Sequence, residues 1–123
     1  MRTALTIALL SLFAAVPAQA YEVETGSIMI CDTQQQIERY VQLFDGNREA
    51  AIKAVNTEAS NPTACAMTNV AYVQGETIGM ARSATDGYKV IQVAVVAVNT
   101  GAGFQLVQPT VFYTLVKVKE FAV

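Results

Sequence analysis

Apolar positions in the first part of the chain follow a strand pattern and then a helical one. Residues 21–30 are rich in valine, isoleucine and methionine, which predicts a strand with an irregularity at Gly26. Asp32, followed three residues later by Gln35, is expected to cap a helix. Gly46 is expected to end this helix, because glycine adopts the left-handed C′ conformation without steric penalty. One helix face carries apolar residues at helical spacing, namely Ile37, Tyr40, Val41 and Phe44.

A second, short helix is predicted directly after the first. Asn47 can cap it, and a narrow apolar stripe of Ala51, Ile52 and Val55 follows. The segment 56–62 is polar and ends in Asn-Pro, so it is expected to be a loop. The two helices together form a predicted hairpin.

From residue 66 onward, β-branched and aromatic residues are punctuated by turn signals. The segment 88–99 is almost continuously apolar, which is typical of a central strand covered on both faces or of a strongly bent barrel strand. Pro109 belongs at an edge or a strand start, because it has no N–H for a ladder. The predicted turns fall at Gly75-Glu76, Asp86-Gly87 and Gly101-Ala102-Gly103. Four strands are predicted, over 66–74, 77–83, 88–99 and 104–107, the last leading through Pro109 into 111–121.

This order of elements predicts an α+β fold. An antiparallel sheet, or a small SH3-like half-open barrel, would include the N-terminal strand and carry the helical hairpin on one side. The apolar helix face, with Ile37, Val41 and Phe44, is expected to pack against Val93 and Val95 of the long central strand. We find no internal repeat.

The first twenty residues have the three zones of a secretory signal peptide. One cation, Arg2, precedes an apolar run from Ala4 to Val16, and the segment ends in an A-x-A cleavage site at Ala20. An apolar run of 13 residues is shorter than the roughly 20 needed to span a bilayer as a helix. The expected organisation is a signal peptide at 1–20 and one domain at 21–123, periplasmic or secreted, with no membrane span after cleavage.

Charge argues against a nucleic-acid partner. Without Arg2, seven basic side chains face ten acidic ones, which gives the expected mature chain a net charge of −3. A stripe of cations that could neutralise phosphates is not present in the sequence.

Cys31 and Cys65 are the only cysteines, and an oxidising compartment favours their pairing. The bond would tie the end of the first strand to the start of the next and close the loop that holds both helices. A redox-active pair is the alternative, but there is no C-x-x-C spacing and no histidine to form a thiolate. A structural disulfide is therefore predicted.

The absence of histidine removes several enzyme classes. Ser-His-Asp and Cys-His catalysis and histidine-based zinc sites all require it. No S-x-x-K spacing, which would suggest Ser-Lys catalysis, occurs in the sequence. No cofactor is expected. Paired carboxylates are the remaining acid–base groups, and the two candidate pairs, Glu22 with Glu24 and Asp32 with Glu38, do not suggest a shared proton site.

Cations on the predicted strands form the best candidate site. Together with two tyrosines they could make a shallow patch for an acidic polymer or a partner protein. The alternative is a solvated sheet face on which lysine discourages edge pairing. The residues concerned are Arg82, Lys89, Lys117, Lys119, Tyr88 and Tyr113.

Three short segments carry a resemblance to a group of proteins. The segment Ile30-Cys31-Asp32-Thr33 opens a helix, Leu43-Phe44-Asp45-Gly46 closes it, and Pro62-Thr63-Ala64-Cys65 returns to the sheet. In this layout the chain resembles small uncharacterised exported proteins of rhizobium-like alphaproteobacteria. The resemblance implies a periplasmic location and paired cysteines, and it implies no activity.

Three functional hypotheses follow, in order of preference. The first is a non-enzymatic periplasmic binding or accessory domain that recognises a protein or a cell-wall polymer through its sheet face. The second is an inhibitor of a hydrolase, inserting the turn at 101–103 or at 84–87 into the enzyme's cleft. The third is an enzyme that uses carboxylates alone.

Overall fold

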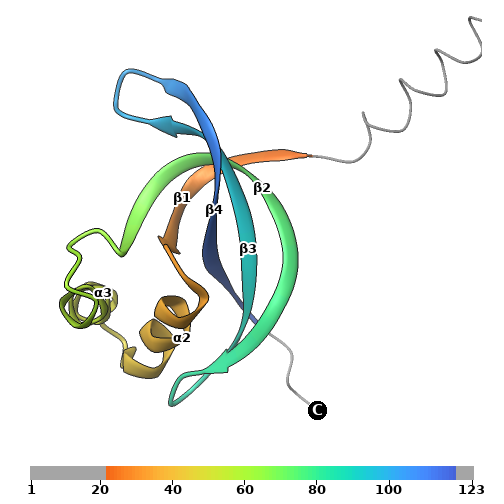
Figure 1. Ribbon diagram of the computed structural model, residues 1–123. Helices are drawn as coiled ribbons and strands as arrows, with labels where there is room; N and C mark the ends of the chain where they lie inside the picture. Colours follow the sequence, from red (N-terminus) through yellow and green to blue (C-terminus); the bar gives the residue numbers. More distant parts are fainter. Residues whose placement is uncertain (1–21, 119–123) are drawn as a thin grey trace, which may run out of the picture.

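The computed structural model describes residues 22–118 (Figure 1). The predicted signal peptide, Tyr21, Lys119 and the end of the last predicted strand lie outside the described residues. The elements are β1 (Val23–Cys31), α2 (Gln34–Leu43), α3 (Arg48–Glu58), β2 (Cys65–Arg82), β3 (Gly87–Asn99) and β4 (Phe104–Lys117). This content confirms the α+β class.

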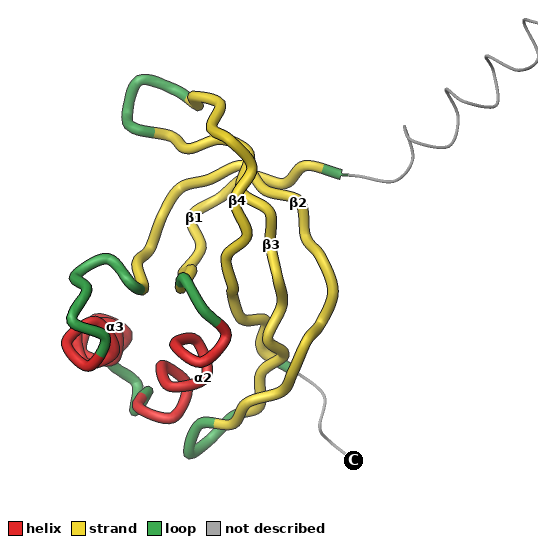
Figure 2. Tube along the Cα trace, viewed as in Figure 1, coloured by secondary structure: helices red, strands yellow, loops and turns green. Residues whose placement is uncertain are grey.

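The four strands form an antiparallel barrel in the order β1-β2-β3-β4. A single pair, Cys31 with Tyr113, closes the barrel between β1 and β4. Both helices lie on one side of the strands (Figure 2), and α2 contacts all four of them while α3 contacts α2 and β2. The predicted helical hairpin on one side is therefore confirmed, and the barrel closes at one point rather than staying half-open.

Helix α2 is capped one residue later than predicted. Thr33, not Asp32, is the N-cap, since its hydroxyl accepts from Gln36 N at 3.1 Å and its own N–H donates to Gln36 Oε1 at 3.1 Å. The reciprocal bonds make a capping box shifted by one position from the predicted pair. The helix ends at Leu43, its C-cap Phe44 has an extended backbone, and Gly46 with φ 108° lies two residues beyond the cap. The prediction of Gly46 as the C′ residue was wrong.

Helix α3 is longer than its sequence pattern indicated. Asn47 is the N-cap, as predicted, and its Oδ1 accepts from Ala50 N at 3.0 Å. The helix continues to Glu58, so Asn56 lies in it and not in a loop. The last three residues of the helix are polar, and Thr57 and Glu58 are exposed to solvent while Asn56 is half-buried.

Strand β2 runs through the predicted turn at Gly75-Glu76. Two register shifts, between Gln74 and Thr77 and between Thr77 and Gly79, let the strand continue without reversing. A Cβ atom at Gly75 would lie 3.0 Å from the carbonyl oxygen of Gln92. The glycine therefore permits close approach to β3, a requirement that the sequence does not distinguish from a turn.

Strand β4 runs continuously through Pro109, from Phe104 to Lys117. The β3–β4 register shifts between Val95, which pairs with Thr110, and Ala97, which pairs with Leu106. Pro109 falls within this irregularity, where a missing N–H breaks no regular ladder.

Buried side chains form two clusters on opposite faces of the strands. The helix cluster contains Ile37 and Val41 of α2, both fully buried, together with Val90 of β3. The strand cluster contains Ile30, Val70, Val93 and Val95. Both faces of β3 are thus covered, as its apolar pattern predicted.

One packing prediction needs correction. The α2 face packs on Val90, whereas Val93 and Val95 belong to the strand cluster. Phe44 is only half-buried, because it lies at the C-cap at the edge of the helix cluster.

Candidate functional site

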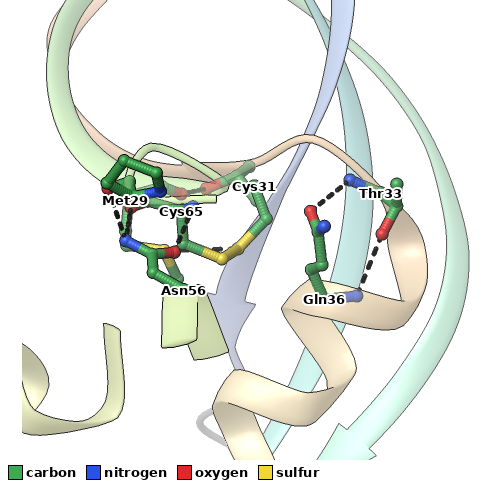
Figure 3. The surroundings of a disulfide bond; sticks show 8 residues. Met29, Cys31, Thr33, Gln36, Asn56 and Cys65 are labelled. Carbon is green, nitrogen blue, oxygen red and sulfur yellow. Dashed lines mark hydrogen bonds between the residues drawn. A yellow bond between two sulfur atoms is a disulfide. The ribbon is translucent and has the colours of Figure 1, made fainter. Parts of the chain in front are cut away.

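The predicted disulfide joins Cys31 and Cys65, which are directly paired residues of β1 and β2 (Figure 3). The two residues are 0% and 1% exposed, so neither sulfur is accessible to a substrate disulfide or thiol. Their Cα atoms are 4.0 Å apart, as two directly opposed residues of neighbouring strands. This burial agrees with a structural bond rather than a redox-active one.

Asn56 of α3 binds the backbone of Cys65 with both ends of its side-chain amide. Its Oδ1 accepts from Cys65 N at 2.8 Å, and its Nδ2 donates to the carbonyl oxygens of Cys65 at 3.0 Å and of Pro62 at 2.9 Å (Figure 3). The amide thereby takes the position that a neighbouring strand would occupy. It anchors the helical hairpin at the start of β2.

The closure between β1 and β4 depends on a side chain as well as on the one backbone pair. Thr114 of β4 is buried, and its hydroxyl donates to the carbonyl oxygen of Met29 at 2.7 Å. Among the described residues, β1 and β4 have no strand pairing beyond Cys31 with Tyr113. The two strands therefore separate on leaving this point.

The structure divides the predicted cationic patch between two faces. Tyr88 pairs with Lys117, so these two side chains share a face. Lys89 follows Tyr88 directly and projects from the other face, where its partners are Met80 and Val116.

The remaining members of the predicted patch follow the same division. Arg82 is two residues from Met80, which places it on the face of Lys89. Tyr113 is four residues from Lys117 on β4 and shares its face. Lys119 lies outside the described residues.

The two tyrosines of the predicted patch support the core. Tyr88 and Tyr113 are half-buried and pack against the helix cluster. Lys117 Nζ lies 3.4 Å from Asp86 Oδ1, an ion pair on the turn between β2 and β3. The rings are thus not free to form an amphipathic binding surface with the cations.

The candidate carboxylate pairs have ordinary surface surroundings. Glu24 Oε1 accepts from the Tyr72 hydroxyl at 3.3 Å, and Glu38 Oε2 accepts from Gln34 Nε2 at 3.0 Å. Asp32 is exposed, at the start of the loop before α2. No cluster of three or more His, Cys, Asp or Glu side chains suited to a metal ion occurs within residues 22–118.

Burial or neighbouring groups shift the pKa values of several ionisable groups outside the predicted cationic patch. Burial raises the pKa of the Tyr40 phenol. Burial, reinforced by the Glu24 carboxylate, raises that of Tyr72. The bidentate contact of Arg39 with Glu58, at 2.9 and 3.0 Å between α2 and α3, lowers the pKa of the Glu58 carboxyl.

An exposed apolar surface at the end of the barrel away from the helices is the most unusual feature of the molecule. The β3–β4 hairpin projects from the other strands there (Figure 1). Leu106 is 88% exposed, and Val111 and Phe104 of the same strand are 50% and 45% exposed. Large apolar side chains exposed in one contiguous group mark interaction sites.

The strand register shows that these side chains are neighbours. Val23, Val73, Ala94 and Val111 form one row across the four strands, because each pairs with the next. A second row, of Ala71, Ala97 and Leu106, projects from the same face because Ala71 is two residues from Val73. Phe104 is two residues beyond Leu106 on this face. Ala71 and Ala97 are themselves buried. We call the exposed side chains of Val23, Val111, Leu106 and Phe104, together with the half-buried Val73 and Ala94, the apolar face.

The hairpin turn beyond the apolar face has a defined backbone. Gly101 and Gly103 have φ of 103° and 107°, a region that side chains with a Cβ atom rarely adopt. Asn99 Oδ1 accepts from Gly101 N at 2.9 Å and fixes the start of the turn. The predicted hairpin turn at 101–103 is confirmed.

The apolar face was not predicted, because its valine, leucine and phenylalanine residues are the types expected in a core. One signal could have identified it. No Asp, Glu, Lys or Arg occurs among the 27 residues from Val90 to Val116. A hairpin of two β-strands with one face on the core would normally carry charges on the other.

Concave surfaces also occur among the described residues. A groove of about 550 Å³ runs along the outer side of α3 and is lined by Glu49, Ile52, Lys53, Asn56, Thr57, Ser60, Asn61 and Pro62. A cleft of about 370 Å³ lies over the strand cluster, with Val70, Val95 and Phe112 among its lining residues and Asp32 at one end. Neither includes a member of the predicted cationic patch, but a third hollow of about 350 Å³, lined by Met80, Ala81, Arg82 and Gly87, includes Arg82.

Comparisons with known proteins give no further information on identity. No protein-family model, no curated protein and no solved structure matches the chain. No helix in the described part of the chain is long and apolar enough to span a membrane.

Proposed function

We propose that this protein is a non-enzymatic binding domain that acts outside the cytoplasm and contacts a protein partner through its apolar face. The observation that carries the proposal is the exposure of Leu106, Phe104 and Val111 on a projecting hairpin. Leaving such side chains in water costs free energy, of the order of 25 cal/mol per Å² of apolar surface, which a partner would recover. The exposure of these side chains therefore favours the binding of a partner that buries them.

The chemistry of the surface favours a protein over a cell-wall polymer. A polymer bearing acidic groups would be recognised by cations, and a neutral sugar chain by aromatic rings with hydrogen-bonding groups around them. The apolar face has one aromatic ring, Phe104, and no charged residue. Its aliphatic side chains suit the apolar centre of a protein interface.

The buried disulfide supports a location in the periplasm or outside the cell, because such bonds persist in oxidising compartments. A relationship of the barrel to the SH3-like class, the resemblance to exported alphaproteobacterial proteins and the cleavage after Ala20 belong to the same proposal. The cationic patch stays a competing prediction for the binding surface.

Inhibition of a hydrolase is the second candidate. It is favoured by the projecting hairpin, whose tip at Gly101-Ala102-Gly103 is narrow and carries no large side chain. Such a tip could enter a cleft while the apolar face contacts the surface around it. A protease or glycosidase inhibited by the purified protein would distinguish this role from passive binding.

A capture experiment with two variants tests the proposal. The protein is expressed in full, recovered from the periplasm, immobilised and exposed to a periplasmic extract. Leu106→Ser should remove the captured partner, whereas Lys89→Ser, which alters an exposed strand residue of the cationic patch, should retain it. The melting temperatures of both should match that of the wild type.

The reverse pattern would contradict the proposal. If Leu106→Ser captures the partner as the wild type does and Lys89→Ser loses it, the cationic patch is the binding surface. Loss of binding with increasing salt would support that reading, because salt screens contacts between exposed charges.

A further inference from the structure

We infer that the partner that covers the apolar face is a second copy of this chain, bound across a two-fold axis. This inference rests on the proposed function, since it names the partner for the same surface. Leu106 would lie near the axis, opposite Leu106 of the other copy. The other candidate occupants are a different protein and a lipid membrane.

The size of the apolar face fits a weak dimer. Four of its side chains, Val23, Phe104, Leu106 and Val111, are between 45% and 88% exposed. Together they present on the order of 400 Å² of apolar surface, a size at which such patches mark interaction sites. Two copies would bury roughly 800 Å² of this surface, which lies with the small interfaces of transient complexes.

The charge pattern fits self-association. In a two-fold interface each residue near the axis meets its own copy, so a charge there would face a like charge. The segment from Val90 to Val116 has no ionisable acid or base among Asp, Glu, Lys and Arg. Two copies of this segment would therefore meet without repulsion between like charges. The segment also has no charge pattern by which it could select a different protein.

The strand edge argues for contact through side chains and for a closed assembly. The outer edge of β4 could add a further strand, but Pro109 lacks an N–H and lies in the register shift between β3 and β4. The Thr110 hydroxyl also donates to the carbonyl oxygen of Gln108 at 2.9 Å. A continuous hydrogen-bonded ladder with another chain is interrupted at this edge. Two copies would therefore associate through the side chains of their apolar faces, as a closed dimer.

A lipid surface is less well matched. Segments that bind membranes combine apolar tips with nearby cations and interfacial Trp or Tyr. The cations of this hairpin, Lys89 and Lys117, lie at the opposite end of β3 and β4 from the turn at 101–103. The protein has no tryptophan.

Sedimentation of the exported protein over a wide range of concentration tests the inference. The wild type should pass reversibly from monomer to dimer, with a dissociation constant on the order of 100 μM for an interface of this size. Leu106→Lys should weaken the association at least about tenfold, because it places two cations at the axis and removes the central apolar contact.

Met80→Lys is the matched control. Met80 is 61% exposed but lies at the other end of the barrel, on the face of Lys89, so this variant should dimerise as the wild type does. The melting temperatures of both variants, measured in dilute solution, report whether each is folded.

The inference would be overturned by a wild type that stays monomeric to about 1 mM, or by Leu106→Lys dimerising unchanged. Sedimentation of the monomeric protein with phosphatidylcholine and phosphatidylglycerol vesicles would instead assign the face to a membrane. A monomeric wild type that still captures another protein through Leu106 would overturn this inference alone. Loss of that capture as well would contradict the proposed function.

Discussion

Asn56 and Cys65, nine residues apart, are joined by two hydrogen bonds in which one side-chain amide pairs with both the N–H and the C=O of the cysteine. The amide comes from the last part of α3, and the cysteine begins β2 and carries the disulfide to β1. One polar side chain therefore fixes the helical hairpin to the covalent link between two strands.

Replacing Asn56 by Ala should lower the free energy of unfolding, although the side chain is only half-buried. The N–H and C=O of Cys65 would lose their partners, which costs about 1–3 kcal/mol. For a domain of this size the melting temperature should fall by roughly 5–15 °C. Thr57→Ala, which removes an exposed hydroxyl bonded within the helix, is the control and should have a much smaller effect. Equal melting temperatures for Asn56→Ala and wild type would show that the hydrogen bonds between Asn56 and Cys65 are not needed for stability.

Thr114→Val should loosen the closure between β1 and β4. The variant keeps the shape of the side chain but leaves the Met29 carbonyl without its donor, at a cost of about 1–2 kcal/mol. Hydrogen exchange of the amides near Cys31 and Tyr113 should then become faster. Thr110→Val, an exposed position on the same strand, should leave that exchange unchanged. Unaltered exchange in Thr114→Val would contradict the role given to the hydroxyl.

The disulfide should resist reagents until the protein unfolds. Both sulfurs belong to residues with almost no exposed surface, so alkylation without reductant should label neither cysteine. Replacing both cysteines by Ala should cost roughly 4 kcal/mol on the loop-entropy account, for a sequence separation of 34. Binding through the apolar face should persist in this variant under conditions where it is folded. Rapid labelling of the native protein would refute the structural assignment.

The contact of Glu58 with Arg39 should stabilise the fold at neutral pH and lose this effect in acid, when the Glu58 carboxyl is protonated. Its carboxyl has a pKa below the ordinary value of 4.5, chiefly because Arg39 donates hydrogen bonds to it. A depressed folded-state pKa gives stability that is present above the unfolded-state value and is lost as pH falls through the folded-state value. Arg39→Gln should therefore reduce the loss of stability between pH 6 and about 2.5. Because the Arg39–Glu58 pair is exposed, added salt should also reduce the pH dependence of stability in the wild type.

Much of the fold could be predicted from periodicity. The spacing of Ile37 and Val41 identified α2, and the compartment implied by residues 1–20 identified the disulfide partners. The shift of the cap from Asp32 to Thr33 shows the usual limit, since either residue can accept the bond and only the helix packing selects one.

The continuity of β2 could not be predicted, because Gly75 carries the same signal in a turn as in a strand irregularity. Gly75 is required by the nearby Gln92 carbonyl, and Pro109 is accommodated by a register shift. Both depend on contacts with a neighbouring strand that the local sequence does not contain.

The candidate site shows where the sequence could have been used better. Tyr88 and Lys89 are consecutive in a strand, so alternation alone places them on opposite faces. The apolar face was hidden for a different reason. Val111 and Leu106 have the residue types of a core, and only the absence of charge over 27 residues distinguishes this exposed apolar hairpin in the sequence.

Hydrogen exchange at low and high protein concentration tests the central claim most directly, because it reports which amides become covered. We expect slower exchange at high concentration for the amides of 104–111 around Leu106, and unchanged exchange for those of 80–89. Protection confined to 80–89, around Met80 and Lys89, would contradict the account, since it would place the interface at the other end of the barrel.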